Sequence, residues 1–197
     1  GGKQSQAKTV DFGASDDPVV AEELQKSGLA QFPAIIGGVV PVVNIKGIAP
    51  GQLKLNNATL SDIFRAKITK WNDPAIASVN SGVALPDTAI TIVYRSDSSG
   101  TTAVFTDFLA QVSPPFKGVV GVGKSVQWPA GVGGKGNAGV AANVTKIDGA
   151  IGYVEYAYVK QNKMSHVSLI NRDGKAVQPS EASFTAAASK ANWTGTP

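Results

Sequence analysis

The chain has 197 residues but no cysteine, and it carries a single histidine. A chain without cysteine forms no disulfide, no thiolate metal site and no cysteine nucleophile. A catalytic triad with a histidine base would depend on His166 alone. Residues 164–169 predict a strand or sheet edge on which His166 is exposed, so we expect no catalytic residue. Because the aspartates near the start have no histidine or cysteine beside them, we also expect no metal site and no cofactor.

Charged residues are sparse, at 16% of the chain, and the net charge is +4. The 18 lysines and arginines are spread along the sequence and form no basic run. A surface that follows a nucleic-acid backbone needs such clustering. We therefore expect no nucleic-acid partner and interpret the lysines as solvated surface.

Long uninterrupted apolar segments are lacking as well. Residues 27–45 carry no charge, but this run contains Pro33, Gly37, Gly38 and Pro41. Proline and glycine break helices, which argues against a membrane span. The shorter apolar runs at 34–36 and 39–43 predict buried strands instead.

Strand and helix signals alternate along the rest of the chain. Strands are expected at residues 9–12 and 89–94, with a β-rich run at 150–158. Helices are expected from Asp17-Pro18 to Ser27-Gly28, at 60–66 with a capping box from Thr59, at 103–112, at 138–144 capped by Asn137, and from Ser180 to Lys190. This order predicts an α/β protein with central sheets.

Residues 95–102, RSDSSGTT, are the most informative stretch of the sequence. They join the predicted strand at 89–94 to the predicted helix at 103–112. A helix N-terminus offers free N–H groups and a partial positive charge, and Gly100 allows the backbone to approach an anion closely. Arg95 adds a forked cation that can bind two oxygens. The pattern predicts an oxyanion cradle, although an ordinary serine-rich helix cap beside a surface arginine would have the same sequence.

Two nucleotide-binding patterns also occur. Residues 118–125, GVVGVGKS, match the phosphate loop of nucleoside triphosphatases, but prolines precede them and the residues after them leave no room for a helix. Residues 131–136, GVGGKG, match the dinucleotide fingerprint, but Pro129 interrupts the strand that should precede them. We interpret the first match as chance and the second as a loop that leads into the helix at Asn137.

Five segments occur in a recognisable order: 9–16 (TVDFGASD), 68–76 (ITKWNDPAI), 95–102 (RSDSSGTT), 133–137 (GGKGN) and 149–156 (GAIGYVEY). Together they resemble the phosphate-binding proteins of bacterial ABC phosphate transporters, the PstS family. The resemblance implies an α/β fold with two lobes, of the periplasmic-binding-protein type II. Residues 1–44 would form part of the first lobe and residues 45–197 a nearly complete second lobe. It also implies that the family's opening strand and returning strands lie before Gly1 and after Pro197, so that the chain is incomplete at both ends.

The resemblance also implies a set of site residues. Arg95 would hold the phosphate, and Ser99, Gly100 and Thr101 would donate hydrogen bonds to it. Asp16 would accept the proton of the phosphate, and Asp97 would pair with the arginine. The implied function is high-affinity capture of inorganic phosphate in the cleft between the lobes, by a monomer that is not an enzyme. The protein would act in the periplasm or anchored at the cell surface, and would deliver phosphate to the membrane permease subunits.

Two alternatives stay open at the level of the residues. A phosphoryl-transfer enzyme could use the loop from Gly118 to Ser125, and it would need a nucleotide and magnesium. A binding protein for another oxyanion could use the same cradle, since the proposed acceptor Asp16 disfavours sulfate but not arsenate.

Overall fold

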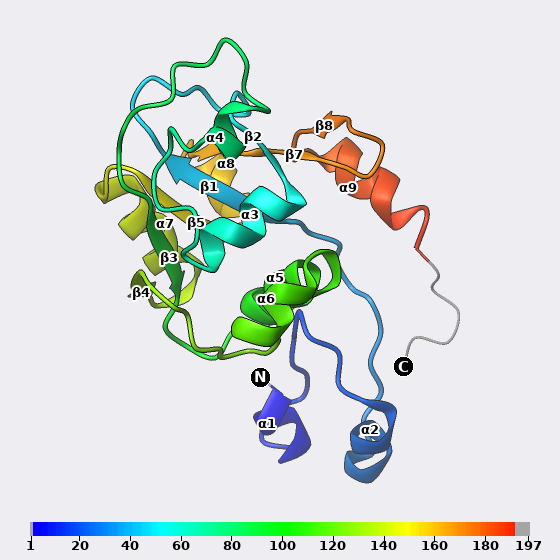
Figure 1. Cartoon of the computed structure of the whole chain (residues 1–197). Coiled ribbons are helices and arrows are strands. Elements are labelled where there is room, and N and C mark those ends of the chain that lie inside the picture. Colours follow the sequence, from blue (N-terminus) through cyan, green and yellow to red (C-terminus); the bar gives the residue numbers. More distant parts are fainter. Residues whose placement is uncertain (1, 192–197) are drawn as a thin grey trace.

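A computed structural model describes residues 2–191 (Figure 1). Gly1 and residues 192–197, where the expected first lobe begins and the expected second lobe ends, lie outside the described residues. Its main feature is a five-stranded mixed sheet in the order β4-β3-β5-β1-β6. The strands are β1 (Val39–Asn44), β3 (Thr91–Arg95), β4 (Val132–Gly134), β5 (Ala150–Glu155) and β6 (Ser165–His166). Strand β3 pairs in parallel with β4 and β5, whereas β1 runs antiparallel to β5 and β6.

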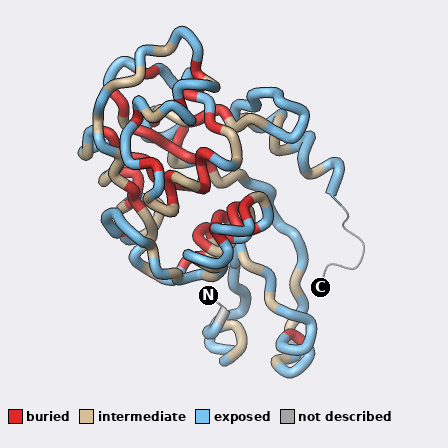
Figure 2. Tube along the Cα trace, viewed as in Figure 1, coloured by how far each residue is buried: buried red, intermediate tan, exposed pale blue. Residues whose placement is uncertain are grey.

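Helices cover both faces of this sheet. The first apolar core contains residues of α3 (Asn57–Phe64), α5 (Gly100–Val112) and α6 (Pro114–Val119), and the second contains residues of α7 (Gly136–Lys146) and α8 (Tyr156–Gln161). Neighbouring strand residues alternate between the two cores: Val43 contributes to the first and Val42 to the second. This period of two is what a sheet buried on both sides requires. The buried residues concentrate in this sheet and its helices (Figure 2).

A smaller sheet lies beside the main one. It has the order β2-β7-β8, with β2 (Lys54–Asn56) parallel to β7 (Ser168–Ile170) and β8 (Ala176–Val177) antiparallel to β7. The short helix α4 (Pro74–Ala77) precedes β3, and α9 (Glu181–Ala188) follows β8. The N-cap of α9 is Ser180, which forms a capping box with Ser183. The structure confirms three predicted elements: the helix that starts at Ser180, the helix at 103–112 and the strand at 39–43.

The N-terminal part of the chain extends away from the sheet. It contains α1 (Gly2–Gln6) and α2 (Ala21–Ser27), and Figures 1 and 2 show these helices below the main body with mostly exposed residues. Helix α2 ends at Gly28, whose left-handed backbone (φ 62°) provides the predicted stop. The expected strands at 9–12 and 34–36 are wrong, since neither segment is in a strand and Ile35 is 91% exposed. An apolar β-type segment forms a strand only where a neighbouring strand accepts its hydrogen bonds, and the described residues supply none to these segments.

The pairing of β1 changes the expected division of the chain. All six residues of β1 pair with β5, so residues 39–44 lie inside the sheet that was assigned to the second lobe. We propose that the division falls before Val39 and not after Asn44. The sequence pattern identified the strand, but strand order depends on pairing between residues that are more than a hundred positions apart.

Three predicted element boundaries also differ. The side chain of Asn56, and not that of Thr59, caps α3. Helix α7 begins behind Lys135, and the side chain of Asn137 instead accepts a hydrogen bond from the backbone of Glu155. Residues 156–158 are helical because the Glu155 side chain caps α8 at the end of β5. Among residues 2–191, no helix has both the length and the apolar character needed to cross a membrane.

Candidate functional site

The loop between β3 and α5 brings most of the predicted site residues together. Arg95 is the last residue of β3, and α5 begins at Gly100. Ser99 is the N-cap of α5, and its hydroxyl oxygen accepts a hydrogen bond from the Thr102 backbone at 3.1 Å. The Ser/Thr cluster therefore lies at a helix start, as predicted. Because Ser99 acts as a cap, the local geometry is consistent with both interpretations of this sequence.

Asp97 holds the guanidinium of Arg95 in a bidentate ion pair. Arg95 donates from Nε to Oδ1 at 2.8 Å and from Nη2 to Oδ2 at 2.7 Å. Oδ1 also accepts from the backbone N–H of Gly136, the first residue of α7, at 2.9 Å. The hydrogen bonds from Arg95 are the main reason why the pKa of the Asp97 carboxyl lies well below its usual range. The hydrogen bond with Asp97 likewise raises the pKa of Arg95, so both groups stay charged.

Asp16 reaches the same loop from the exposed N-terminal segment. The hydroxyl of Thr101 donates to its Oδ2 at 3.4 Å, and Arg95 Nη1 donates to the Thr101 oxygen at 3.5 Å. Both bonds are at the long end of the range and are therefore weak. A methyl group on Gly100 would lie 2.9 Å from Cβ of Asp16, which explains why glycine occupies this position. A cation, a hydroxyl, a helix N-terminus and an acceptor-only carboxylate thus meet in one place.

A buried tyrosine supports this loop, and sequence reasoning assigned it no role. Tyr153 of β5 has no exposed surface, and its ring stacks on Phe105 of α5 with 4.4 Å between centroids. Its hydroxyl shares a hydrogen bond with the Thr102 hydroxyl at 2.7 Å and accepts one from the backbone N–H of Arg95 at 3.3 Å. Burial raises the pKa of this phenol, which keeps it protonated. The available signal was a polar-tipped aromatic residue within an apolar, buried strand.

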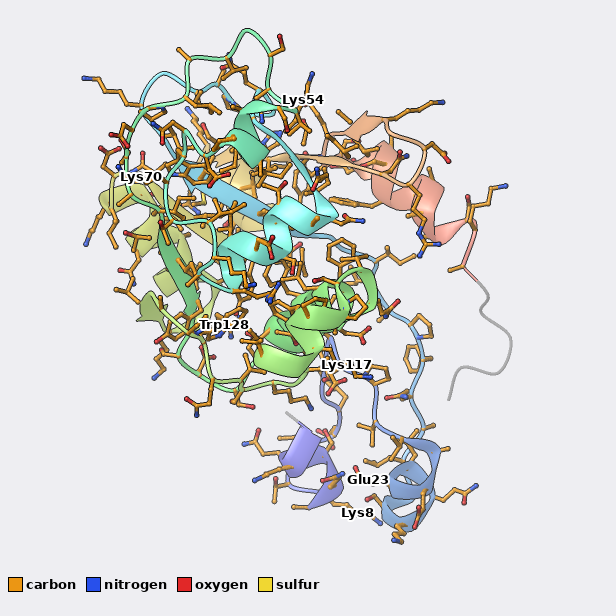
Figure 3. The ribbon with its side chains drawn as sticks, viewed as in Figure 1. Lys8, Glu23, Lys54, Lys70, Lys117 and Trp128 are labelled. Atoms are coloured by element: carbon orange, nitrogen blue, oxygen red, sulfur yellow. The ribbon has the colours of Figure 1, made fainter. Side chains whose placement is uncertain are left out.

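Trp128, which is labelled in Figure 3, is partly buried and extends the aromatic cluster. It lies 5.9 Å from the rings of both Tyr94 and Tyr153, measured between centroids. Together with Phe64 and Phe105 these rings form the floor beneath β3 and the start of α5. The cluster thus packs against β3 and α5, the two elements that flank the loop after Arg95.

The segment that matches a phosphate loop does not have the geometry of one. Helix α6 ends at Val119, inside the matching segment, and no strand leads into it. After Ser125 the next helix described is α7, which begins at Gly136. Lys124 pairs with Asp17 at 2.9 Å, and its carbonyl accepts from the Ser99 backbone at 2.9 Å. This loop therefore connects the N-terminal segment to the start of α5.

The dinucleotide-like segment differs from its expected structure. Residues 132–134 form strand β4, so the prediction of a loop here is wrong: parallel pairing with β3 overrides the effect of Pro129. Helix α7 follows almost at once, but its first N–H donates to Asp97. The N-terminus of α7 therefore contributes a hydrogen bond to the carboxylate of the Arg95–Asp97 pair.

His166 is not exposed in the way that its strand pattern predicted. Both imidazole nitrogens are buried, and neither has a hydrogen-bond partner among the described residues. The residue lies in β6, opposite Val42 of β1. The prediction failed because a two-residue strand carries too little pattern to show which face is covered.

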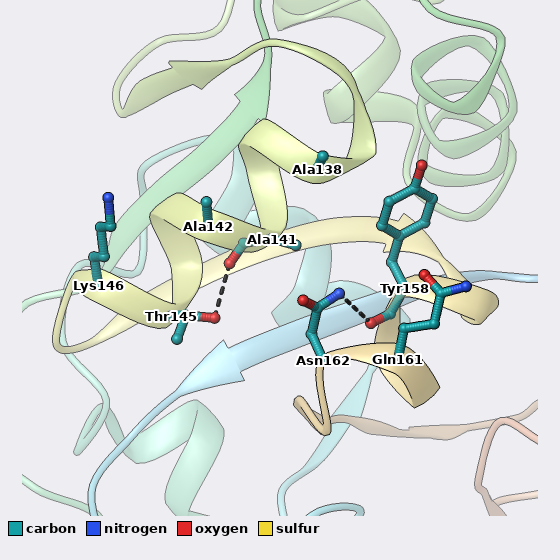
Figure 4. Close-up of a pocket in the computed structure, with 8 residues that line it drawn as sticks. All are labelled: Ala138, Ala141, Ala142, Thr145, Lys146, Tyr158, Gln161 and Asn162. Carbon is teal, nitrogen blue, oxygen red and sulfur yellow. Dashed lines mark hydrogen bonds between the residues drawn. The ribbon is translucent and has the colours of Figure 1, made fainter.

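A surface hollow lies away from the Arg95 loop. It is a groove of about 380 Å³ between α7 and α8 (Figure 4). Its wall is made of small and polar side chains, including Ala142, Thr145, Tyr158 and Asn162. Thr145 and Asn162 direct their polar atoms to carbonyls of their own helices. None of the predicted site residues lines this groove.

Comparisons with known proteins identify the family. A model described as a PBP superfamily domain matches residues 1–193. The Phosphate-binding protein PstS of Pasteurella multocida is 61% identical over 195 residues, which cover 98% of this chain and 57% of that protein. The protein of the same name from Haemophilus influenzae is 55% identical, with coverage of 98% and 58%. The chain thus spans about half the length of the curated relatives that it matches.

Solved structures show the same fold. One is a putative phosphate ABC transporter substrate-binding protein from Clostridium perfringens with bound phosphate (TM-score 0.64, 23% identity, 95% of this chain and 65% of that chain). Another is a DING protein (TM-score 0.68, 21% identity, 92% of this chain and 55% of that chain). At these identities the likeness concerns the fold alone. It is the mixed α/β, type II binding-protein fold that the family resemblance implied. From the domain match and this fold, the chain belongs to the PBP superfamily.

Proposed function

We propose that this chain carries a binding site for inorganic phosphate and belongs to a protein that delivers phosphate to the permease subunits of an ABC importer. The observation that carries the proposal is the convergence of Arg95, Thr101 and Asp16 at the N-terminus of α5. Its relatives at 61% and 55% identity are named phosphate-binding proteins. The protein acts as a monomer, in the periplasm or anchored at the cell surface, and breaks no bond.

The positive charge of the site comes from Arg95 and from the start of α5. Asp97 holds the guanidinium flat, and Nη1 lies toward Thr101. Arginine recognises two oxygens of an oxyanion at once, which a lysine cannot do. The backbone N–H groups at Gly100 and Thr101 and the hydroxyls of Ser99 and Thr101 add neutral donors, and the helix dipole favours the anion.

Asp16 provides selectivity among tetrahedral anions. An ionised carboxylate only accepts hydrogen bonds, so it favours an anion that still carries a proton. A fully deprotonated anion such as sulfate would face the carboxylate without a hydrogen between them. An unpaired acceptor costs roughly 1–3 kcal/mol when it is buried. Asp16 is exposed in this chain, so discrimination of that order requires the bound anion and the rest of the site to cover the carboxylate. Arsenate protonates as phosphate does, so this carboxylate does not reject it.

The competing interpretation as a phosphoryl-transfer enzyme has less support. That enzyme would need the segment from Gly118 to Ser125 to lie between a strand and a helix, where the helix dipole can hold a nucleotide phosphate. The observed segment overlaps the end of α6, and Lys124 is engaged with Asp17.

The proposal is tested by calorimetric titration of the native protein that carries this chain. Phosphate and arsenate should bind, sulfate should bind much more weakly, and ATP with magnesium should not bind. Arg95→Lys should weaken phosphate binding at least about tenfold, because a lysine cannot bridge two oxygens. Arg172→Lys makes the same exchange at an exposed position in the β7–β8 turn and should leave the affinity unchanged. Sulfate binding as tight as phosphate binding, or equal losses in the two variants, would contradict the proposal.

A further inference from the structure

The Tyr153 hydroxyl is a buried polar group with two partners, and each partner belongs to a different element of the site. The Thr102 hydroxyl lies 2.7 Å away in the first turn of α5, and the Arg95 backbone N–H lies 3.3 Å away at the end of β3. Buried hydroxyls usually find partners, so the bonds themselves are ordinary. The placement of the two bonds is unusual, because one oxygen atom connects the strand that carries the cation to the helix that carries the neutral donors.

The tyrosine ring has little freedom to move. It stacks on Phe105 at 4.4 Å with an interplanar angle of 16°, and it packs in an edge-to-face arrangement with Phe64, with 6.0 Å between centroids. Phe105 lies on α5, so the same helix packs on the ring and bonds to the hydroxyl. Parallel pairing of β3 with β5, with Val93 opposite Gly152, brings Tyr153 level with the end of β3. The hydroxyl is therefore a fixed point between the two elements.

We propose that Tyr153 is a positioning residue for anion binding, whose hydroxyl sets the distance between Arg95 and the first turn of α5. The inference rests on the proposed function. Gly100 and Thr101 are in the same turn as Thr102, and Thr102 N–H also bonds to the Ser99 cap. A shift of that turn relative to β3 would move the helix N–H groups and the guanidinium apart. An anion held by both would then lose part of its contacts with one of them.

Tyr153→Phe tests the proposal because it keeps the stacked ring and removes only the hydroxyl. Phosphate affinity of the native protein should fall about tenfold, as expected for misalignment of one or two charge-assisted bonds. Tyr158→Phe is the matched control, since this tyrosine lies on α8 in the groove of Figure 4, away from the Arg95 loop. Its phosphate affinity should equal that of the wild type.

Variants of Thr102 provide the second arm if Tyr153→Phe folds poorly. Thr102→Val removes the same hydroxyl pair from the other side and should weaken phosphate binding, while Thr102→Ser should restore most of the loss. The double variant Tyr153→Phe/Thr102→Val should bind phosphate no more weakly than Tyr153→Phe alone, because both substitutions remove the same hydrogen bond between the two hydroxyls. A purely structural role would lower unfolding stability and leave the phosphate affinity of the folded variants unchanged.

The outcomes separate the two proposals. If the wild type binds no phosphate, the proposed function fails and this inference fails with it. If the wild type binds phosphate while Tyr153→Phe and Thr102→Val bind it equally well, only the inference is overturned. Additive losses in the double variant would also overturn it, since they would show that the two hydroxyls act independently.

Discussion

At the scale of single residues, Asp97 joins the end of β3 to the start of α7. One carboxylate accepts two hydrogen bonds from Arg95 and one from the first N–H of α7. The Arg95 side chain is 10% exposed and that of Asp97 is 32% exposed, so water screens the pair only in part. Loss of either partner would leave a partly buried charge without its counterpart, which is the costly outcome for such pairs.

The lowered pKa of Asp97 makes folding stability sensitive to acid. A carboxyl whose pKa is lower in the folded state contributes stability above its ordinary unfolded pKa, and this contribution is lost as pH falls toward the lowered value. Between about pH 4.5 and pH 2.5, the unfolding free energy of the wild type should therefore fall more steeply than that of Asp97→Asn. Urea unfolding at a series of pH values measures both slopes. Asp148→Asn, in the exposed turn before β5, should keep the wild-type slope, and an equally steep slope in Asp97→Asn would show that other carboxyls dominate.

At the scale of elements, the N-terminus of α5 has a stabilising role as well as its proposed binding role. Ser99 caps α5 in the same way that Ser180 caps α9, each through a side-chain oxygen that accepts from a backbone N–H in the first turn. The two caps differ in what surrounds them. Ser99 is 2% exposed and lies beside the site, whereas Ser180 is half-buried beside the small sheet.

This pair of caps allows stability to be separated from binding. Ser99→Ala and Ser180→Ala should each lower the unfolding free energy by about 1 kcal/mol, the usual cost of an N-cap. Only Ser99→Ala should also weaken phosphate binding, because it removes a proposed donor and loosens the turn with the helix N–H groups. Denaturant unfolding and phosphate titration of both variants check the two effects. Equal phosphate affinity in the two variants would mean that Ser99 is a cap and nothing more.

At the scale of the whole molecule, residues 3–38 carry several large apolar side chains that the rest of the described chain leaves exposed. Phe12 is 87% exposed, Phe32 79% and Ile35 91%. The central sheet, by contrast, buries its large side chains on both faces. Large exposed apolar side chains gathered in one segment mark a contact surface or promote association.

Because of these exposed side chains, we expect the chain to self-associate when its 197 residues are produced alone. Replacing Phe12 and Ile35 by serine should lower self-association, because it removes two of the most exposed apolar side chains. Sedimentation velocity over a range of concentrations measures the effect. Val119→Ser changes an exposed side chain of α6 in the main body and is the control. An unchanged association state in the double variant would show that the segment does not drive association.

The sequence by itself determined those features that depend on neighbours within a few positions. Local hydrogen bonds and backbone conformation account for the helix that begins after Ser99, for the helix capped by Ser180 and for the end of α2 at Gly28. The sequence pattern also singled out Arg95, and the family resemblance added Asp97. These residues are only two positions apart and bond directly.

The tertiary structure decided the features that depend on which distant segments meet. Strand order moved residues 39–44 into the main sheet, and residues 9–12 stayed outside any strand for want of a neighbour. Asp16 reaches Thr101 across 85 positions, and the Tyr153 hydroxyl meets Thr102 across 51. Local propensity acts through nearby backbone and side chains, whereas such contacts exist only once the topology has placed two elements side by side. For this reason the sequence could single out the cation of the candidate site, but not the tyrosine that we propose sets its distance from the helix.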